Sequence, residues 1–149
     1  DPAHPNCLAP RKRPRATLTP SLVLKDGRPH MVFGTPGGDQ QDQWQLQLLL
    51  RHIHHGMNLQ QAIDAPAWHI NHFVSSFWPR KLERNLITLE GRFDPGVAEA
   101  LRRRGHRVVV GEPWSEGRLS ASSREVRAGG PYLRAAANPR GMQGYAAGR

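Results

Sequence analysis

The feature that most constrains this chain is a Thr-Pro-Gly-Gly segment at positions 35–38, between a β-rich run and a helical pattern. Proline fixes φ and removes a backbone donor, whereas two consecutive glycines reach positive φ without steric cost. Backbone N–H groups of such a segment can approach a ligand closely and form an anion nest or an oxyanion hole. Gly37 and Gly38 are therefore candidate oxyanion donors, and an ordinary turn is the alternative.

Turn residues and periodicity assign the elements on either side of this segment. Residues 21–25 and 30–34 are short β-rich runs separated by Asp26-Gly27, so we expect two adjacent antiparallel strands. A helix is expected over 39–55, behind these strands, with Asp39 placed as its N-cap. Its inner face would consist of the apolar residues at i, i+3, i+4 and i+7, which are Leu46, Leu49, Leu50 and Ile53.

The remaining segments alternate between helical and strand patterns, which favours an α+β or layered α/β fold. Residues 1–20 are rich in proline and basic residues and are interpreted as an extended arm, whereas 67–85 are expected to be irregular. The other predicted elements are a short helix between Asn58 and Pro66, a strand over 86–90, a helix from Asp94-Pro95 to Gly105, a strand over 107–110, and weaker strands over 119–124 and 132–136.

Composition narrows the classes of partner. The formal net charge of +9 would attract nucleic acid or anionic lipid, but the basic residues are spread along the chain. A solvated basic surface, or a face that pairs with an acidic partner chain, is the simpler interpretation, and nucleic-acid binding is not favoured. No apolar run approaches the ~18 residues that span a membrane. The single Cys7 cannot form an internal disulfide, and either the bacterial cytoplasm or the periplasm is compatible with it.

Histidine spacing raises the question of a metal site. His52 and His55 are three residues apart, as are His69 and His72, but neither pair has a nearby third ligand of the kind that zinc requires. Surface or packing roles explain these histidines more simply, so no metal and no cofactor are predicted. Cys7 lies in the proline-rich arm, with no strand-to-helix turn that would activate it as a nucleophile.

Five segments taken in order resemble the small subunit of the gamma-glutamyltransferase family. They are Lys-Arg-Pro-Arg-Ala-Thr-Leu-Thr-Pro at 12–20, Thr-Pro-Gly-Gly at 35–38, the run from Gly56 to Pro66, Arg-Gly-His-Arg-Val at 104–108, and Ala-Ala-Asn-Pro-Arg-Gly at 136–141. The Gln-rich stretch at 40–43 and the run 142–145 point to the broader gamma-glutamyltransferase-like branch. The similarity covers nearly the whole chain.

The resemblance implies a four-layer αββα N-terminal-nucleophile hydrolase sandwich, of which this chain would be the C-terminal part of the small subunit. In that family the precursor cuts itself before a Thr, and the new N-terminal Thr attacks the amide of a gamma-glutamyl compound such as glutathione. The Pro-Gly-Gly glycines, here Gly37 and Gly38, donate to the tetrahedral oxyanion. A pair of hydroxyl residues, at the positions of Ala16 and Thr17, holds the α-carboxylate of the substrate.

Two departures from the family pattern matter. Ala16 has lost one hydroxyl, so that only Thr17 can donate there. The nucleophilic Thr lies upstream of Asp1, as do the large subunit and part of the small one, so this chain alone is predicted to be inactive. The alternatives are a non-catalytic remnant of the family and a basic module that binds nucleic acid or protein.

Overall fold

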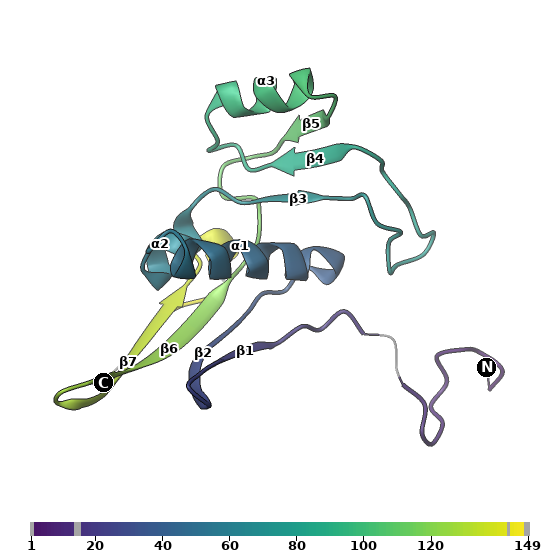
Figure 1. The fold of residues 1–149 in the computed structure, drawn as a ribbon. Helices are drawn as coiled ribbons and strands as arrows, with labels where there is room; N and C mark the ends of the chain where they lie inside the picture. Colours follow the sequence, from purple (N-terminus) through teal and green to yellow (C-terminus); the bar gives the residue numbers. More distant parts are fainter. Residues whose placement is uncertain (1, 14–15, 143, 148–149) are drawn as a thin grey trace.

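The computed structural model describes residues 2–13, 16–142 and 144–147. Figure 1 shows a four-stranded sheet with two helices on one face, and beyond these helices a smaller three-stranded sheet with a third helix. The larger sheet, sheet A, has the order β1-β2-β6-β7, and the smaller one, sheet B, has the order β3-β4-β5. Strands and helices are therefore mixed along the chain, as the sequence predicts.

Sheet A is antiparallel throughout. Its first hairpin joins β1 (Ser21–Lys25) to β2 (Arg28–Gly34), with Ser21 opposite Phe33, which confirms the predicted pairing. Asp26 and Gly27 adopt left-handed φ angles of 52° and 71° in the turn between them. The sheet continues through β6 (Ser120–Arg127), paired with β2, and β7 (Gly130–Ala137), paired with β6, so both weaker strand predictions are confirmed with slightly longer bounds.

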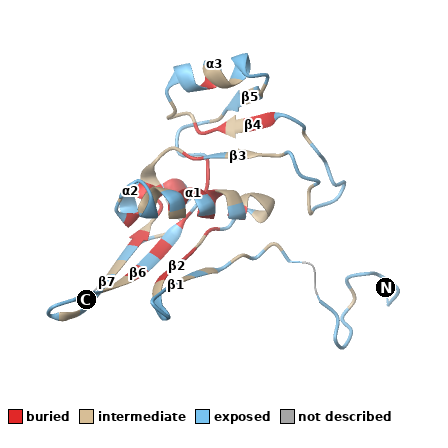
Figure 2. Ribbon diagram, viewed as in Figure 1, coloured by how far each residue is buried: buried red, intermediate tan, exposed pale blue. Residues whose placement is uncertain are grey.

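Two helices cover one face of sheet A. A short 3₁₀ turn, η1 (Gly38–Gln40), leads into α1 (Gln41–Ile53), and α2 (Leu59–Asp64) follows. Buried residues, red in Figure 2, lie between these helices and the sheet. The core between them comprises Met31, Phe33, Trp44, Leu48, Leu59, Ala62, Ile63, Ala67, Leu119, Ala121 and Ala136.

The predicted inner face of α1 is wrong. Leu46, Leu50 and Ile53 are 54%, 41% and 53% exposed, and only Leu49 packs partly against the core. Trp44 and Leu48 face the sheet instead. The buried face of α1 is mixed, because three of its five buried residues are glutamines, Gln41, Gln45 and Gln47. Asp39 does not cap α1 either, since the N-cap residue is Gln40 and the Asp39 carboxylate accepts a hydrogen bond from the Ser76 N–H.

Two glutamines on α1 bind the backbone of one neighbouring strand. Gln43 donates to the carbonyl of Ile70 and accepts from its N–H, at 3.0 and 2.8 Å. Gln47 makes the same pair of bonds with Trp68, at 2.7 and 3.3 Å. These amides satisfy the free edge of β3 (Trp68–Ile70) as a neighbouring strand would. The strand lies within 67–85, which the sequence predicted to be irregular.

Sheet B completes the described fold. Its centre, β4 (Leu86–Leu89), pairs antiparallel with β3 and parallel with β5 (Arg107–Val110). The crossover between β4 and β5 is α3 (Pro95–Arg103), which begins as predicted with Asp94 as N-cap and proline at the first turn. Among the described residues, no helix is both long enough and apolar enough to cross a membrane.

Candidate active site

The Pro-Gly-Gly segment forms the connection between β2 and α1. Gly37 has φ 142° and Gly38 has φ 57°, conformations that other residues rarely adopt. Within the described chain, neither N–H donates a hydrogen bond to another residue. Both groups also sit at the start of a helical turn, where backbone donors have no partner within the helix. Two unengaged donors therefore lie side by side at a helix start, as an anion site requires.

Neighbouring groups fix this loop. The buried hydroxyl of Thr35 accepts from the Arg118 N–H at 2.9 Å and donates to the carbonyl of Pro36 at 2.8 Å. Side-chain rings lie against both glycines. A methyl group on Gly37 would overlap the benzo ring of Trp44, and one on Gly38 would lie 2.9 Å from Cε2 of Phe77. The loop is thus held in one conformation by packing as well as by hydrogen bonds.

The N-terminal arm docks beside this loop. The Thr19 hydroxyl donates to Oε1 of Gln41 at 3.2 Å and accepts from Nε2 of Gln45 at 2.8 Å, and the Ser21 hydroxyl donates to Oε1 of Gln45 at 2.6 Å. Gln41 is the first residue of α1 and lies three residues beyond Gly38. These contacts bring the segment that contains Ala16 and Thr17 to the end of α1 that carries the glycines. Pro14 and Arg15 of the same motif lie outside the described residues.

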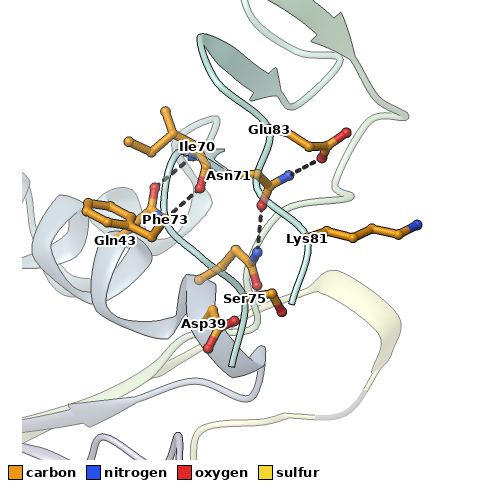
Figure 3. A pocket seen from close by; sticks show the side chains of 9 residues that line it. Asp39, Gln43, Ile70, Asn71, Phe73, Ser75, Lys81 and Glu83 are labelled. Atoms are coloured by element: carbon orange, nitrogen blue, oxygen red, sulfur yellow. Dashed lines mark hydrogen bonds between the residues drawn. The ribbon is translucent and has the colours of Figure 1, made fainter. Parts of the chain in front are cut away.

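A polar hollow of about 180 Å³ opens beside Asp39, between the start of α1 and the segment 70–83 (Figure 3). Asn71 links two sides of the hollow. It accepts a hydrogen bond from Nε2 of Gln40 at 2.9 Å and donates one to Oε2 of Glu83 at 3.3 Å. The N–H of Ser76 donates to Asp39 at 2.7 Å, and so the wall of the hollow is tied to the residue that follows Gly38.

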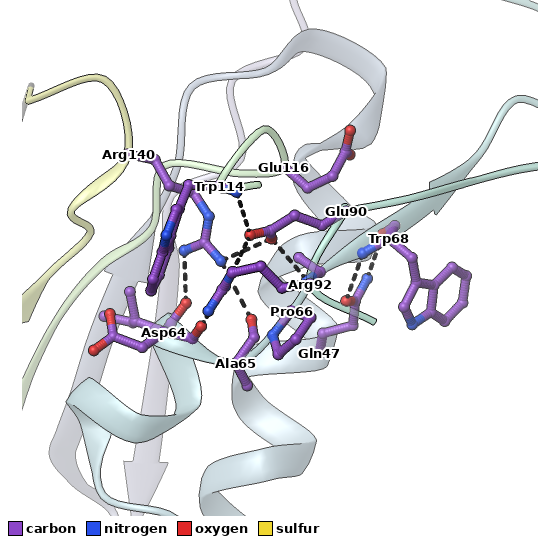
Figure 4. Close-up of polar contacts among 12 residues, drawn as sticks. Gln47, Asp64, Ala65, Pro66, Trp68, Glu90, Arg92, Trp114, Glu116 and Arg140 are labelled. Carbon is purple, nitrogen blue, oxygen red and sulfur yellow. Dashed lines mark hydrogen bonds and ion pairs between the residues drawn. The ribbon is translucent and has the colours of Figure 1, made fainter. Parts of the chain in front are cut away.

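A second polar cluster, buried between the two sheets, surrounds Glu90 (Figure 4). This carboxylate is fully buried and accepts four hydrogen bonds, two on each oxygen. Oε1 accepts from Nε of Arg92 and from the N–H of Trp114, both at 2.7 Å. Oε2 accepts from the N–H of Ala67 at 3.0 Å and from Nη2 of Arg140 at 2.9 Å.

Opposing effects set the pKa of Glu90. Burial raises it, but the hydrogen bonds from Arg92, Ala67 and Arg140 outweigh burial, and the pKa lies below its usual range. Arg51 reaches the same region and donates to the carbonyls of Ala62, Ala65 and Pro66. Burial, followed by repulsion from Arg140, lowers the pKa of Arg51. The cluster joins the two sheets, because all four hydrogen bonds to the Glu90 carboxylate come from within the chain. Nε of Arg140 is buried without a hydrogen-bond partner among the described residues.

The histidine pairs do not converge on a metal site. Nδ1 of His52 lies 2.8 Å from the carbonyl of Met57, and Nδ1 of His69 lies 2.5 Å from Oε2 of Glu116. The N–H of Asn85 donates to Nδ1 of His72. Across residues 2–13, 16–142 and 144–147, no group of three or more His, Cys, Asp or Glu side chains could hold a metal ion.

The comparisons with known proteins give the family. The model of the gamma-glutamyltranspeptidase family matches residues 1–148. The chain belongs to that family. It is 39% identical over 149 residues to the oxamate amidohydrolase proenzyme of Klebsiella pneumoniae, covering 99% of this chain and 26% of that one. It is also 36% identical over 141 residues to the glutathione hydrolase-like YwrD proenzyme of Bacillus subtilis, covering 95% and 26%. The chain thus spans about a quarter of the length of these relatives.

Solved structures confirm the fold class of this family member. LmbA2991HD superimposes with a TM-score of 0.85 at 58% identity, over 100% of this chain and 26% of that chain. The cephalosporin acylase of Bacillus halodurans gives 0.72 at 32% identity, over 94% and 24%. The predicted α+β class, as part of an N-terminal-nucleophile hydrolase sandwich, is therefore confirmed. Sheet A and the helices α1 and α2 form adjacent layers of strands and helices.

The sequence of this family member indicates the conformations of Gly37 and Gly38 but not the rings that pack against them. The turn chemistry of Gly37 and Gly38 is local and can be read from four residues. Trp44 and Phe77 are seven and forty residues further along the chain than Gly37, and nothing in their spacing links them to it. Glu90 and Arg140 are fifty residues apart. The one usable signal for their role was chemical: charged residues in otherwise apolar surroundings need partners.

Proposed function

We propose that this chain is the C-terminal part of the small-subunit region of an N-terminal-nucleophile amidohydrolase that cleaves or transfers gamma-glutamyl or related acyl groups, such as that of glutathione. Its contribution is the oxyanion hole and part of the substrate pocket. The observation that carries the proposal is the pair of unengaged N–H groups on Gly37 and Gly38, held at the start of a helix in a member of this family.

The chemistry follows from where charge develops. When a nucleophile attacks the amide carbon, the carbonyl oxygen becomes an anion, and fixed donors stabilise it more than they stabilise the ground state. Gly37 and Gly38 fit this role because their conformations are enforced by contacts with Trp44 and Phe77. The nucleophile itself, an N-terminal Thr whose amino group serves as the base, would come from another part of the full-length protein, and the large subunit would complete the site.

The acyl group is the open part of this proposal. Thr17 would donate to the α-carboxylate of a gamma-glutamyl group, whereas Ala16 offers no hydroxyl. One relative is named for oxamate and another for glutathione. A gamma-glutamyl substrate held by a single hydroxyl, or a smaller acyl group without that carboxylate contact, fits the pair of Ala16 and Thr17.

The test is Gly38→Val in the full-length proenzyme that carries this segment, with Gly56→Val as the matched control. Both glycines are left-handed, with φ 57° and 66°, so both substitutions strain the backbone similarly. Gly56 has open space around it and lies at the far end of α1. Valine keeps the N–H of residue 38 but rarely adopts its conformation, so the donor should be displaced. Acylation by a gamma-glutamyl anilide should fall by up to the roughly 10²–10³-fold of a lost donor in Gly38→Val and should be nearly unchanged in Gly56→Val. Parental acylation in a folded Gly38→Val enzyme would refute the proposal.

The same proposal predicts that this chain, expressed by itself, does not hydrolyse a gamma-glutamyl anilide above background. It supplies donors for an oxyanion but spans about a quarter of the length of its relatives, and the proposed nucleophile belongs to the remaining part of the full-length protein. Steady turnover by the isolated chain would contradict the assignment. A proenzyme that processes itself but remains inactive would instead support the non-catalytic alternative.

A further inference from the structure

We propose that Trp44, clamped by the pair of His69 and Glu116, positions the Pro-Gly-Gly loop for catalysis. The three side chains would act on the reaction only through the backbone of Gly37, and they are therefore positioning residues. This inference rests on the proposed function of Gly37 and Gly38 as oxyanion donors.

The indole of Trp44 lies between two glycines. On one side its benzo ring occupies the place that a Cβ on Gly37 would take. On another side a Cβ on Gly117 would lie 3.3 Å from its Cγ and Cδ2. Both glycines have positive φ, at 142° and 71°. The backbone approaches the ring at two points where only glycine combines that conformation with enough space, and so a shift of the ring would move Gly37 directly.

The indole N–H indicates that the shape of Trp44 matters more than its contribution to stability. Trp44 is 8% exposed, and its Nε1 is buried without a hydrogen-bond partner among the described residues. A buried donor without a partner is unfavourable, and a phenylalanine would avoid this cost. The larger ring is retained at a position where its benzo portion supports Gly37.

The hydrogen-bonded pair of His69 and Glu116 packs against the indole of Trp44. The His69 ring meets Trp44 edge-on, with centroids 5.8 Å apart and planes at 88°. Its Nδ1 lies 2.5 Å from Oε2 of Glu116, and both side chains are largely buried, at 14% and 8% exposure. His69 belongs to β3 of sheet B, whereas Glu116 immediately precedes Gly117. The pair therefore draws together the two segments that enclose the indole.

One more bond closes the arrangement around the loop. The N–H of Arg118 donates to the Thr35 hydroxyl at 2.9 Å, which ties the segment 116–118 to the strand end that leads into the glycines. Trp44 is thus enclosed by the loop on one side and by 116–118 with His69 on the other. Loosening any part should misplace the Gly37 N–H, and a misplaced donor lowers the rate of the chemical step more than it weakens substrate binding.

The experiment compares Trp44→Phe with Trp114→Phe in the full-length proenzyme. Both remove the same atoms, but Trp114 stacks on Arg92, whereas the three atoms nearest to a Cβ on Gly37 all belong to Trp44. We expect kcat for a gamma-glutamyl anilide to fall about 10-fold in Trp44→Phe with KM within about twofold, less than the loss from removing a donor outright. Trp114→Phe should keep the parental kcat. Equal kcat in the two variants would overturn the proposal.

Glu116 provides a second, independent pair of variants. Glu116→Gln keeps an acceptor for His69 and should retain most of the parental kcat, whereas Glu116→Ala removes it and should reproduce the kcat loss of Trp44→Phe. A purely structural role would instead lower thermal stability and the yield of active sites, measured by titration, without changing kcat per active site. That result for both Glu116→Ala and Trp44→Phe would overturn the inference.

Gly38→Val distinguishes this failure from a failure of the proposed function. If acylation is impaired in Gly38→Val but parental in Trp44→Phe and Glu116→Ala, the positioning role is rejected and the proposed oxyanion hole still stands. Acylation unimpaired in folded Gly38→Val rejects both.

Discussion

The cluster around Glu90 and the loop at Gly37 and Gly38 differ in whether their hydrogen-bonding groups are paired within the chain. Glu90 is fully buried, and each of its oxygens accepts two hydrogen bonds from within the chain. At the glycine loop, two neighbouring N–H groups have no acceptor among the described residues. The first arrangement is closed and joins sheet A to sheet B, whereas the second is rigid but leaves its donors free.

The difference separates stability from function within one small structure. The carboxylate of Glu90, with both oxygens satisfied, helps to hold the two sheets together and leaves neither oxygen free for a ligand. Donors that are fixed in direction and have no acceptor within the described chain are available to a developing charge without reorganisation. The rings of Trp44 and Phe77 supply the rigidity of the loop, and hydrogen bonds to the glycine N–H groups do not.

The sharpest way to break the comparison is Glu90→Ala. It would leave the guanidinium groups of Arg140 and Arg92 without their carboxylate, and Arg140 is only 2% exposed. Removing one partner of a buried ion pair typically costs about 3–5 kcal/mol, so the midpoint of urea unfolding should fall steeply. Glu125→Ala is the control, because Glu125 pairs with Arg127 and Arg134 near the surface, where the loss should be about 0–1 kcal/mol. Equal losses of stability in Glu90→Ala and Glu125→Ala would show that the buried Glu90 cluster contributes no more than a surface ion pair.

Acid should weaken the same cluster by a smaller amount. The pKa of Glu90 is lowered in the folded state, so its contribution to the free energy of unfolding is fully present above the unfolded pKa of about 4.3 and is lost as the pH falls through the folded value. We expect stability to decline below about pH 5. Between about pH 5 and pH 3 the decline should be shallower in Glu90→Gln, measured by urea unfolding. Identical slopes would show that other carboxylates govern acid unfolding.

The smallest effect should come from restoring a hydroxyl beside Thr17. Ala16→Ser adds a donor where the family pattern has one, and a single hydrogen bond contributes about 1 kcal/mol, or roughly a fivefold lower KM for a gamma-glutamyl substrate. The kcat should change little, because the added contact is made equally in ground and transition states. Thr17→Ala is the matched opposite and should raise KM. A neutral substrate analogue without an α-carboxylate should not distinguish the variants; if it does, the hydroxyl has another role.

By itself, the sequence determined the features that depend on neighbouring residues. Asp26 and Gly27 turn the first hairpin, and Asp94 with Pro95 begins α3. Asn58 caps α2 by accepting from the N–H of Gln61, while the Gln61 side chain accepts from the N–H of Asn58. The glycine conformations at 37 and 38 belong to the same class. All of these follow from φ preferences and short-range hydrogen bonds within about four residues, which is why they could be predicted.

Tertiary structure alone decided which face of α1 is buried, where β3 forms and what Glu90 binds. Periodicity marked Leu46, Leu50 and Ile53 as the apolar face of α1, but the face that packs on the sheet carries Trp44 and Leu48 among glutamines. The three-residue strand β3 exists because β4 and the glutamines of α1 satisfy its two edges. Contacts between residues tens of positions apart depend on shape and burial, which no local pattern encodes.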